Sequence, residues 1–377
     1  MESQSGITLE EYAEKIKETD KLKGDIETIA LGLFGEVGSI LSSAKKERRE
    51  GGVYDFKNSI QEEIGDALWY FCRLSRSLGF DIEQLMPEAY SQSPPFKLIA
   101  TNHNSSPVAH LPSVKQKNIS ETLPCLGKAA ADLLHIPVDK GEQKSLLKSF
   151  FSSYLDTVSA SGVKFHDVVD GNLKKTQGRF LRCSNNELPN FDEQYEEDER
   201  LPDTFEIEIK QKKNGKTYMK WQGVFIGDPL TDNIKEEDYY RFHDVFHMAN
   251  AAILHWSPTF RALIKHKRKS DPLVDEHQDS GRAIVIEEGL TAWVFSVAKE
   301  HALFEDQEQL SFGLLKNIQQ FVKGYEVERC PASLWESAIL EGYKVFRDVK
   351  KYSAGTVIGN RKDRTIRFVP HENSSDA

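Results

Sequence analysis

The sequence contains little cysteine, and its cysteines lie far apart. The 377 residues include four, with no CxxC spacing between any two of them: Cys72, Cys125, Cys183 and Cys330. Neither a disulfide framework nor a thiolate zinc site is expected, and the reducing cytoplasm is the predicted location. The sequence also lacks an uncharged apolar run of roughly 18 residues, and charges are spread through its N-terminal segment. It therefore predicts neither a membrane-spanning helix nor a secretory signal.

Net positive charge is absent as well. Lys and Arg number 49 against 59 Asp and Glu, a formal net charge of −10, so the chain as a whole is not expected to coat nucleic acid. A small anionic substrate would need metal ions or a local basic patch to offset this charge. Wholesale disorder is excluded, because 39% of the residues are hydrophobic and 10% are aromatic. A chain of this length predicts two or three domains.

The first part of the sequence predicts an all-α helical bundle. Apolar residues recur with helical spacing in several segments, and a glycine pair ends the second of them. The predicted helices are Glu10–Lys23, Asp25–Glu50, Phe56–Leu78, Lys144–Ala160 and Phe165–Phe180. A stretch rich in Pro and Ser, residues 87–120, is predicted to be an insertion. Residues 1–185 form the first predicted domain.

Residues 186–377 predict a separate, mostly helical α+β domain with two β-hairpins. The acidic run Asp192–Arg200 is expected to be a solvated boundary, and helical periodicity covers Glu236 to Lys351. Asn214-Gly215 is typical of a hairpin turn. The predicted strands are Thr204–Lys210, Thr217–Ile226, Gly355–Ile358 and Arg364–Val369. The fold class of the whole chain is therefore predicted to be mainly α.

Acidic residues lie beside apolar ones in two of the predicted helices. Glu36 is flanked by Gly35 and Val37, while Glu63 and Asp66 are three residues apart and so share one side of a helix. If the two helices pack antiparallel through Gly51-Gly52, Glu36 comes near that pair. Carboxylates that converge between helices need cations, and Mg2+ prefers oxygen ligands. The alternative is that these acids lie on ordinary solvated helix faces. The neighbouring glycines indicate either close helix packing or room for a ligand: Gly35, Gly38 and Gly65.

These segments resemble the all-α nucleoside triphosphate pyrophosphohydrolases, the MazG-like family. Its ExxE and ExxD blocks are similar to Leu33-Phe34-Gly35-Glu36-Val37-Gly38 and Glu62-Glu63-Ile64-Gly65-Asp66-Ala67-Leu68-Trp69-Tyr70, and its last helix is similar to residues 167–182. The resemblance implies release of pyrophosphate from a nucleoside triphosphate with Mg2+ or Mn2+, in a homo-oligomer that is a dimer or a tetramer. It implies that Glu36, Glu63 and Asp66 are catalytic and that Glu62 is a further Mg2+ ligand. It also implies a set of residues that bind the substrate: Lys57, Asn172, Lys174, Lys175 and Arg179.

One position departs from the family pattern. The second acid of ExxE would fall at position 39, where this chain has Ser39. Three outcomes stay open: slow hydrolysis, use of Glu62 in its place, or nucleotide binding without cleavage. The basic residues of the last helix, which include Arg182, also have a plain alternative. Lysines near a helix end are commonly solvated and interact with the negative end of the helix dipole.

The second domain carries a histidine-rich segment. In Arg241-Phe242-His243-Asp244-Val245-Phe246-His247 the histidines are four residues apart, so a helix would place both on one face, as in sites for metals such as Zn2+. The segment is an HDxxH relative of HExxH, with the shorter Asp244 in the base position. Either Glu287 or Glu288 could complete the site, and Asp275, His277 and Asp279 are further candidates. The alternative is a pair of buried histidines in a structural ion-pair network.

Two classes of function follow from these patterns. One is a cytoplasmic hydrolase whose first domain cleaves a nucleoside triphosphate and whose second domain senses or processes the product. The other is a nucleotide-binding regulatory or phage-defence protein with a degenerate site and a C-terminal effector domain. Neither a membrane nor a nucleic acid is an expected partner. The sequence does not choose between nucleotide-pool cleansing and defence, or name the nucleotide.

Overall fold

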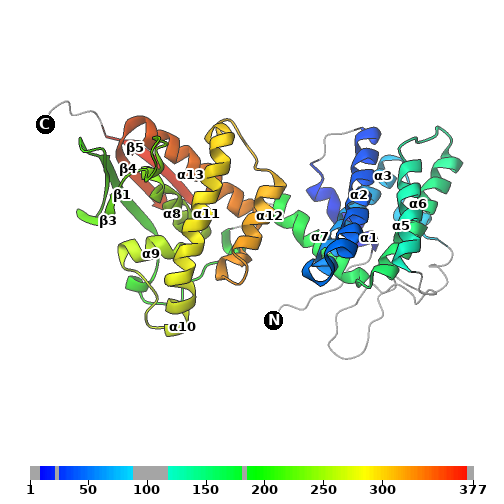
Figure 1. The fold of residues 1–377 in the computed structure, drawn as a ribbon, viewed down its shortest axis with the longest axis horizontal. Helices are drawn as coiled ribbons and strands as arrows, with labels where there is room; N and C mark the ends of the chain where they lie inside the picture. Colours follow the sequence, from blue (N-terminus) through cyan, green and yellow to red (C-terminus); the bar gives the residue numbers. More distant parts are fainter. Residues whose placement is uncertain (1–8, 22–24, 88–117, 181–184, 372–377) are drawn as a thin grey trace. The chain divides into compact units, whose positions relative to one another are not determined.

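The chain consists of two compact units, Met1–Leu181 and Arg182–Ala377. A computed structural model describes residues 9–21, 25–87, 118–180 and 185–371. Within these ranges the protein is mainly α, as predicted, and the second unit contains a small antiparallel sheet (Figure 1). The units divide after Leu181, whereas the sequence predicts a boundary after residue 185.

The first unit is a helical bundle. Its α-helices are α1 (Leu9–Thr19), α2 (Ile26–Glu50), α3 (Phe56–Ser77), α5 (Ile119–Asp132), α6 (Lys140–Ser161) and α7 (Phe165–Phe180). Side chains cap several of them: Asp25 accepts from the Thr28 amide at the start of α2, and Asp139 does the same for the Glu142 amide in α6. The apolar stripes of the helices meet in one core.

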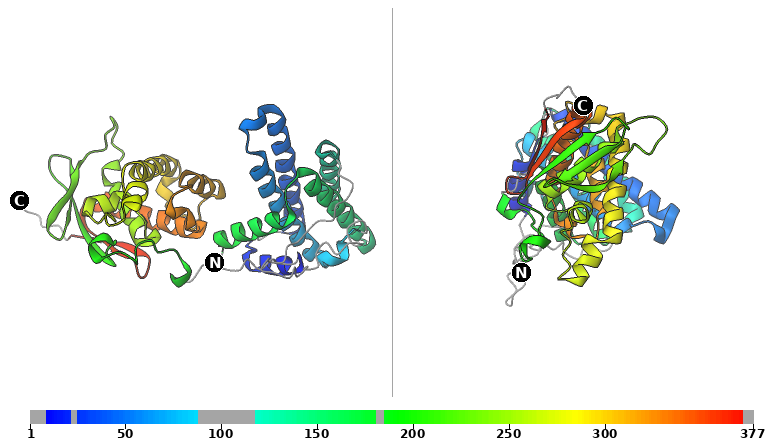
Figure 2. Two further views of the ribbon diagram at one scale, coloured as in Figure 1. Left: turned by 90° about the horizontal axis from the view of Figure 1, so that it is seen from below. Right: turned by 90° about the vertical axis from the view of Figure 1, so that its left-hand side faces the viewer.

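Helices α2 and α3 form a hairpin and lie side by side (Figures 1 and 2). The turn between them is a short 3-10 segment, Gly51–Val53, and Gly51 there has a φ of 60°. A glycine outside the predicted set lets the two helices approach: a Cβ at Gly32 would lie 2.2 Å from the Tyr70 ring. A Cβ at Gly65 would lie 3.0 Å from Asn172 Cβ, so this glycine brings α3 close to α7.

Three sequence predictions for the first unit need correction. The predicted insertion, residues 87–120, ends too late, because Asn118 caps α5 and Ile119 begins it. Residues 88–117 of that insertion lie outside the described residues. No helix is predicted from the sequence for the segment of α5, which contains a proline, Pro124. Helix α6 begins at Lys140, before the predicted Lys144.

One helical stretch, 26–53, is long and apolar enough to cross a membrane by length and composition alone. The core helix of a soluble protein passes the same test. Within the bundle, one face of α2 is buried against its neighbours, including Ile29, Leu33, Val37 and Ile40.

The second unit packs helices on one face of a five-stranded antiparallel sheet of order β3-β2-β1-β4-β5. The strands are β1 (Thr204–Gln211), β2 (Thr217–Trp221), β3 (Val224–Leu230), β4 (Ala354–Asn360) and β5 (Thr365–Pro370). Alternate β1 residues, Phe205, Ile207 and Ile209, enter the core, as the alternation predicts. The predicted return strand Thr217–Ile226 is wrong as one piece. Gln222 and Gly223, both with positive φ, make a tight turn that divides it into β2 and β3.

The single helical span predicted from Glu236 to Lys351 is divided in the structure into several helices. They are α8 (Asp244–Ala249), α9 (Pro258–Ile264), α10 (Pro272–Val274), α11 (Gly281–Glu300), α12 (Phe312–Phe321) and α13 (Ala332–Tyr352). A π-helical turn, Asn250–Leu254, continues α8, and another, Asp275–Asp279, precedes α11. Most of these segments contribute to a single apolar core.

A buried ion-pair network lies within the second unit. Asp192 is 1% exposed and accepts from Arg261 at 2.5 Å and from Arg361 at 2.7 Å. Arg268 pairs with Asp279 and with Glu326, each at 2.6 Å. The prediction of a solvated acidic run is therefore wrong at its first residue, Asp192, because two guanidinium groups compensate its burial.

Candidate functional site

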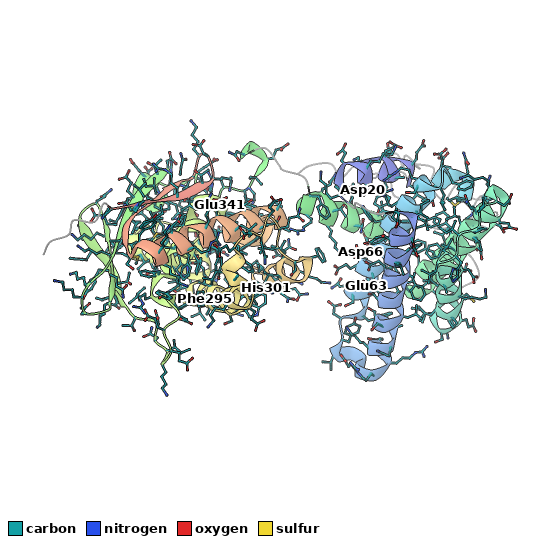
Figure 3. The ribbon with its side chains drawn as sticks, turned by 90° about the horizontal axis from the view of Figure 1, so that it is seen from above. Asp20, Glu63, Asp66, Phe295, His301 and Glu341 are labelled. Atoms are coloured by element: carbon teal, nitrogen blue, oxygen red, sulfur yellow. The ribbon has the colours of Figure 1, made fainter. Side chains whose placement is uncertain are left out.

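Three carboxylates of the first unit meet between α2 and α3. Glu36 comes from α2. Glu63 and Asp66 come from α3, where Figure 3 labels them. One oxygen of each lies within 4.8 Å of the others, and all three residues are half-buried. Glu63 and Asp66 share one side of α3 because they are three residues apart, and the hairpin brings Glu36 opposite them. Carboxylate oxygens grouped in this way are a ligand set that suits Mg2+ or Mn2+.

The group carries strong electrostatic repulsion. Burial and the charges of Asp66 and Glu63 raise the pKa of Glu36 to about 7. Burial, Glu36 and Asp66 also raise the pKa of the Tyr70 phenol. A divalent cation among the three carboxylates would favour their ionised forms.

Helix α7 supports the cluster with two polar side chains. Asn172, which is buried, donates to Asp66 Oδ1 at 2.9 Å and accepts from the Tyr12 hydroxyl at 2.7 Å. Lys175 donates to Asp66 Oδ2 at 2.6 Å and to Glu62 Oε1 at 2.8 Å. Although burial opposes its charge, Asp66 and Glu62 raise the pKa of Lys175. A fixed positive charge therefore lies beside the carboxylates.

A hollow of about 210 Å³ is lined by Asn172 and Lys175, the two α7 residues that contact Asp66. Its walls come from α3 and α7 and include Asn58, Gln61, Glu62, Asn172 and Lys175. On α2, Gly35 and Gly38 are exposed, and a Cβ at either would meet no described atom within 4 Å. These two glycines leave open space beside Glu36, whereas Gly65 is a site of close packing.

Several of the predicted site residues lie outside the carboxylate cluster. Glu62 binds Lys175 and lies outside the group of three carboxylates. Lys57 is exposed in the first turn of α3, and Lys174 pairs with Asp170 at 3.0 Å. Arg179 is buried on α7, with its guanidinium 5.7 Å from the Phe180 ring centre. Arg182 lies outside the described residues.

Sequence reasoning missed Tyr12 and Gln61, and only packing reveals them. Tyr12 is fully buried on α1 and reaches Asn172 across 160 residues of sequence. Gln61 donates to the Asp167 carbonyl at 3.2 Å and lines the hollow. Ser39 is half-buried one helical turn after Glu36.

A second cluster lies in the second unit, where α8 meets α11. His243, His247 and Glu288 each offer a ligand atom within 4.8 Å of the others. Glu288 Oε2 is 3.6 Å from His243 Nε2, and Glu288 Oε1 is 3.3 Å from His247 Nε2. The two imidazole rings are 5.6 Å apart and nearly perpendicular, with an angle of 81° between them.

Glu287 has a different position from Glu288. It is fully buried, 3.1 Å from His247 Nδ1, and it accepts from Asn250, Ser257 and the Thr259 amide at 3.0 Å each. Although burial opposes protonation, Glu287 and Glu288 raise the pKa of His247. Burial alone would raise the pKa of Glu288, but its contacts with His243 and His247 outweigh burial and lower that pKa.

The remaining predicted candidates divide between this cluster and the ion-pair network. Asp244 is buried beside the cluster, with Oδ1 3.9 Å from His243 Nε2. Asp279 instead belongs to the network with Arg268, and Asp275 accepts from Ser280. His277 lies in the π-helical turn before α11 and is exposed.

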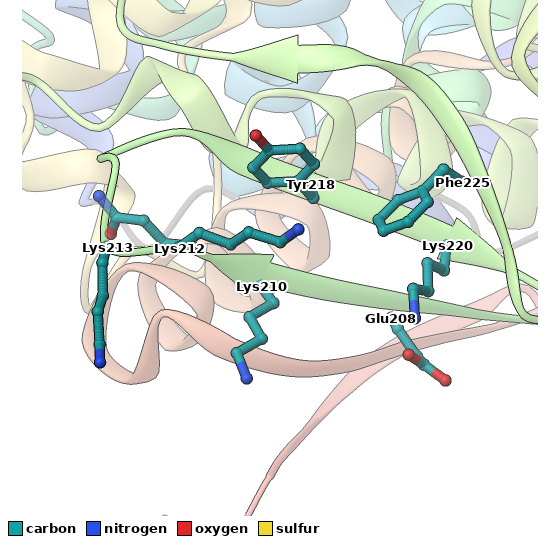
Figure 4. A pocket seen from close by; sticks show the side chains of 8 residues that line it. Glu208, Lys210, Lys212, Lys213, Tyr218, Lys220 and Phe225 are labelled. Carbon is teal, nitrogen blue, oxygen red and sulfur yellow. The ribbon is translucent and has the colours of Figure 1, made fainter. Parts of the chain in front are cut away.

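The open face of the sheet carries a local basic patch (Figure 4). Lys212 Nζ lies 4.1 Å from the Tyr218 ring centre, and Lys220 Nζ lies 5.0 Å from that of Phe225. The hollow there measures about 540 Å³, and its lining also includes Glu208, Lys210 and Lys213. Positive charge is thus concentrated on β1, β2 and the turn between them, in a chain that is negative overall.

Together these observations define a two-part protein. A helical unit holds a carboxylate cluster with a lysine beside it, and an α+β unit holds a histidine–glutamate cluster. Residues 186–372 match the family model described as the MazG C-terminal domain. The match supports a MazG-associated C-terminal domain in the second unit and indicates a MazG-related protein. Comparison of the chain with curated proteins and with solved structures finds no match.

Proposed function

We propose that the first unit is a nucleoside triphosphate pyrophosphohydrolase that depends on Mg2+ or Mn2+. The observation that carries this proposal is the convergence of Glu36, Glu63 and Asp66 beside a fixed lysine and a hollow. The MazG-related second unit supports it, because it links the chain to proteins of the resembling family.

The carboxylates fit a hard divalent cation by their chemistry. Glu36, Glu63 and Asp66 would hold the ion, which when bound supplies an activated water and charge compensation for a polyphosphate. Asn172 holds the Asp66 carboxylate in place through one hydrogen bond. Lys175 neutralises Asp66 and Glu62 and offers its ammonium group to a substrate phosphate. The products would be a nucleoside monophosphate and pyrophosphate.

The second unit is assigned, within this proposal, to sensing or further processing of the nucleotide. The alternative function is a nucleotide-binding regulatory or defence protein, favoured by one observation: Ser39 replaces an acid of the family pattern. Three carboxylates then bind a metal–nucleotide complex without turnover. The two functions differ in whether pyrophosphate is released.

A panel of ribo- and deoxyribonucleoside triphosphates with Mg2+ or Mn2+ tests the proposal, with pyrophosphate release and thermal shift measured on the same samples. Turnover that Glu63→Gln abolishes supports the enzyme, with the exposed Glu83→Gln as a matched control. Stabilisation by a nucleotide without pyrophosphate release favours the regulatory alternative. If no nucleotide is cleaved and none shifts the melting temperature, both functions are wrong.

A homo-oligomer belongs to the same proposal. Helix α2 presents exposed apolar residues, among them Leu31 at 58% and Phe34 at 39% exposure. Light scattering coupled to gel filtration tests this part, with a dimer or tetramer as the expected result and Leu31→Glu as the disrupting variant. A monomer at all concentrations contradicts it.

A further inference from the structure

We propose that the second unit binds its own transition-metal ion through His243 Nε2, His247 Nε2 and the Glu288 carboxylate. This site is separate from the carboxylate cluster of the first unit and goes beyond the pyrophosphohydrolase proposed there. Two imidazole nitrogens and one carboxylate oxygen, with further positions left for water or substrate, are a common ligand set for catalytic metals.

The geometry brings the ligand atoms to one point. Each oxygen of Glu288 faces one histidine, at 3.6 Å from His243 Nε2 and 3.3 Å from His247 Nε2. His247 is completely buried, and in the described structure neither of its nitrogens makes a well-directed hydrogen bond. A buried imidazole without such a bond, facing a carboxylate, is the arrangement that a bound cation would complete.

The outer nitrogens of both histidines face acceptors. His243 Nδ1 lies 2.9 Å from the Tyr240 carbonyl, and His247 Nδ1 lies 3.1 Å from Glu287 Oε1. The Tyr240 carbonyl accepts from His243 Nδ1, which leaves the lone pair on His243 Nε2 directed at the metal position. At His247, Glu287 lies where it would hold a proton on Nδ1 once a metal replaces the proton on Nε2. Both histidines therefore have their Nε2 atoms available on the Glu288 side.

Glu287 is a positioning residue in this arrangement. Three donors hold its carboxylate, from Asn250, Ser257 and the Thr259 amide, each at 3.0 Å. The π-helical turn after α8 carries Asn250, and the start of α9 carries the other two donors. This frame orients His247 from behind, as outer carboxylates commonly do for metal-binding histidines.

Charge and access are consistent with a divalent ion. Glu287, Glu288 and Asp244 surround the two histidines, so the neighbourhood has an excess of negative charge. The Glu288 side chain is 38% exposed, which gives the ion and a substrate a path to the cluster. Imidazole ligands favour transition metals such as Zn2+ and Fe2+, whereas carboxylates alone suit Mg2+ or Mn2+, so the two units are expected to differ in the metal that they bind.

Titration of the full-length, chelator-treated protein with Co2+ in excess Mg2+ tests the proposal. We expect one Co2+ per chain to give visible absorption bands typical of nitrogen coordination. Glu288→Gln and His243→Asn should weaken Co2+ binding at least about tenfold. The control is His301→Asn, which changes an exposed histidine of the same unit (Figure 3).

The controls separate this site from the first unit. Glu63→Gln should leave the Co2+ spectrum unchanged, even if it abolishes pyrophosphate release. Circular dichroism of each variant shows that it is folded, and Glu288→Gln is the variant of choice because Glu288 is the least buried ligand. Absence of the bands in wild type, or unchanged Co2+ binding in folded Glu288→Gln and His243→Asn, would overturn the proposal.

Discussion

Asn172 on α7 donates a hydrogen bond to Asp66 on α3 at 2.9 Å, and the Tyr12 hydroxyl donates to the same amide from α1 at 2.7 Å. One buried side chain thus joins three helices at the edge of the carboxylate cluster. The bond to Asp66 leaves the other oxygen of that carboxylate with Lys175. Helix α7 therefore contacts both oxygens of the Asp66 carboxylate.

Replacement of Asn172 by Ala should destabilise the first unit. The Tyr12 hydroxyl would lose its acceptor in a buried position, which costs about 1–3 kcal/mol. Hydrogen exchange measured on peptides of the first unit would show faster exchange in α1, α3 and α7. Gln84→Ala, which removes an exposed amide from the same unit, is the control. Equal exchange in the two variants would contradict this role.

Lys175→Met should destabilise the first unit without metal and increase its stabilisation by Mg2+. The variant loses the charge that neutralises Asp66 and Glu62, so its melting temperature without metal should fall. Added Mg2+ should then raise that temperature more than in wild type, while the KM for a triphosphate increases. Lys174→Met is the matched control, because Lys174 is exposed and pairs with Asp170 instead of with the cluster. Identical behaviour of the two variants would exclude a special position for Lys175.

The stability of the first unit should fall as pH rises in the absence of metal. Burial and the neighbouring carboxylates raise the pKa of Glu36 from 4.5 to about 7. Between these values the folded protein holds a proton that the unfolded chain has released, so stability declines across this window and levels off above it. Melting curves from pH 5 to 8 measure this. Glu36→Gln should flatten the slope, and Mg2+ should reduce it; a slope unchanged by Glu36→Gln would contradict the assignment.

Ser39→Glu should restore a fourth carboxylate to the cluster. Ser39 follows Glu36 by three residues, on the same side of α2. The added ligand should lower the Mg2+ concentration needed for half-maximal pyrophosphate release. Ser42→Glu adds the same charge one turn further along the helix and is the control. If both variants require the same Mg2+ concentration as wild type, position 39 is not a ligand position.

Asp192→Ala should destabilise the second unit strongly. It leaves Arg261 and Arg361 buried without their shared carboxylate, and loss of one partner from such a pair costs about 3–5 kcal/mol. Burial alone would raise the pKa of Asp192, but the two guanidinium groups outweigh it and lower that pKa below 3.8. The stability that Asp192 contributes is therefore fully present above pH 3.8 and is lost in more acidic solution. Urea unfolding followed by tryptophan fluorescence measures this, with exposed Asp198→Ala as the control.

The sequence was informative where the geometry is local. Glu63 and Asp66 share a helix side by spacing alone, and the glycine pair before α3 indicated the hairpin that brings Glu36 opposite. Lys174 and Lys175 could not be separated, because adjacent helix residues differ by a rotation whose direction only packing with α3 determines. The choice of Glu288 over Glu287 as the residue facing both histidines likewise depends on how α11 lies against α8.

Most wrong predictions concern residues that are buried by contacts with distant parts of the sequence. Asp192 lies in an acidic run, and its two arginine partners are 69 and 169 residues away, so the local pattern indicated solvent. The division between β2 and β3 was missed because Gln222-Gly223 is a weaker hairpin signal than Asn214-Gly215. Tyr12 gave no signal, since an aromatic residue on an apolar helix face is ordinarily core.

Gly65 allows α3 and α7 to pack closely at the proposed cation site. Because a Cβ there would lie 3.0 Å from Asn172 Cβ, even Ala would force Asn172 to give way by a few tenths of an ångström, on the helix that also carries Lys175 beside Asp66. The absence of a side chain at Gly65 thus lets α7 bring the group proposed to receive the phosphate chain close to the groups proposed to hold the cation.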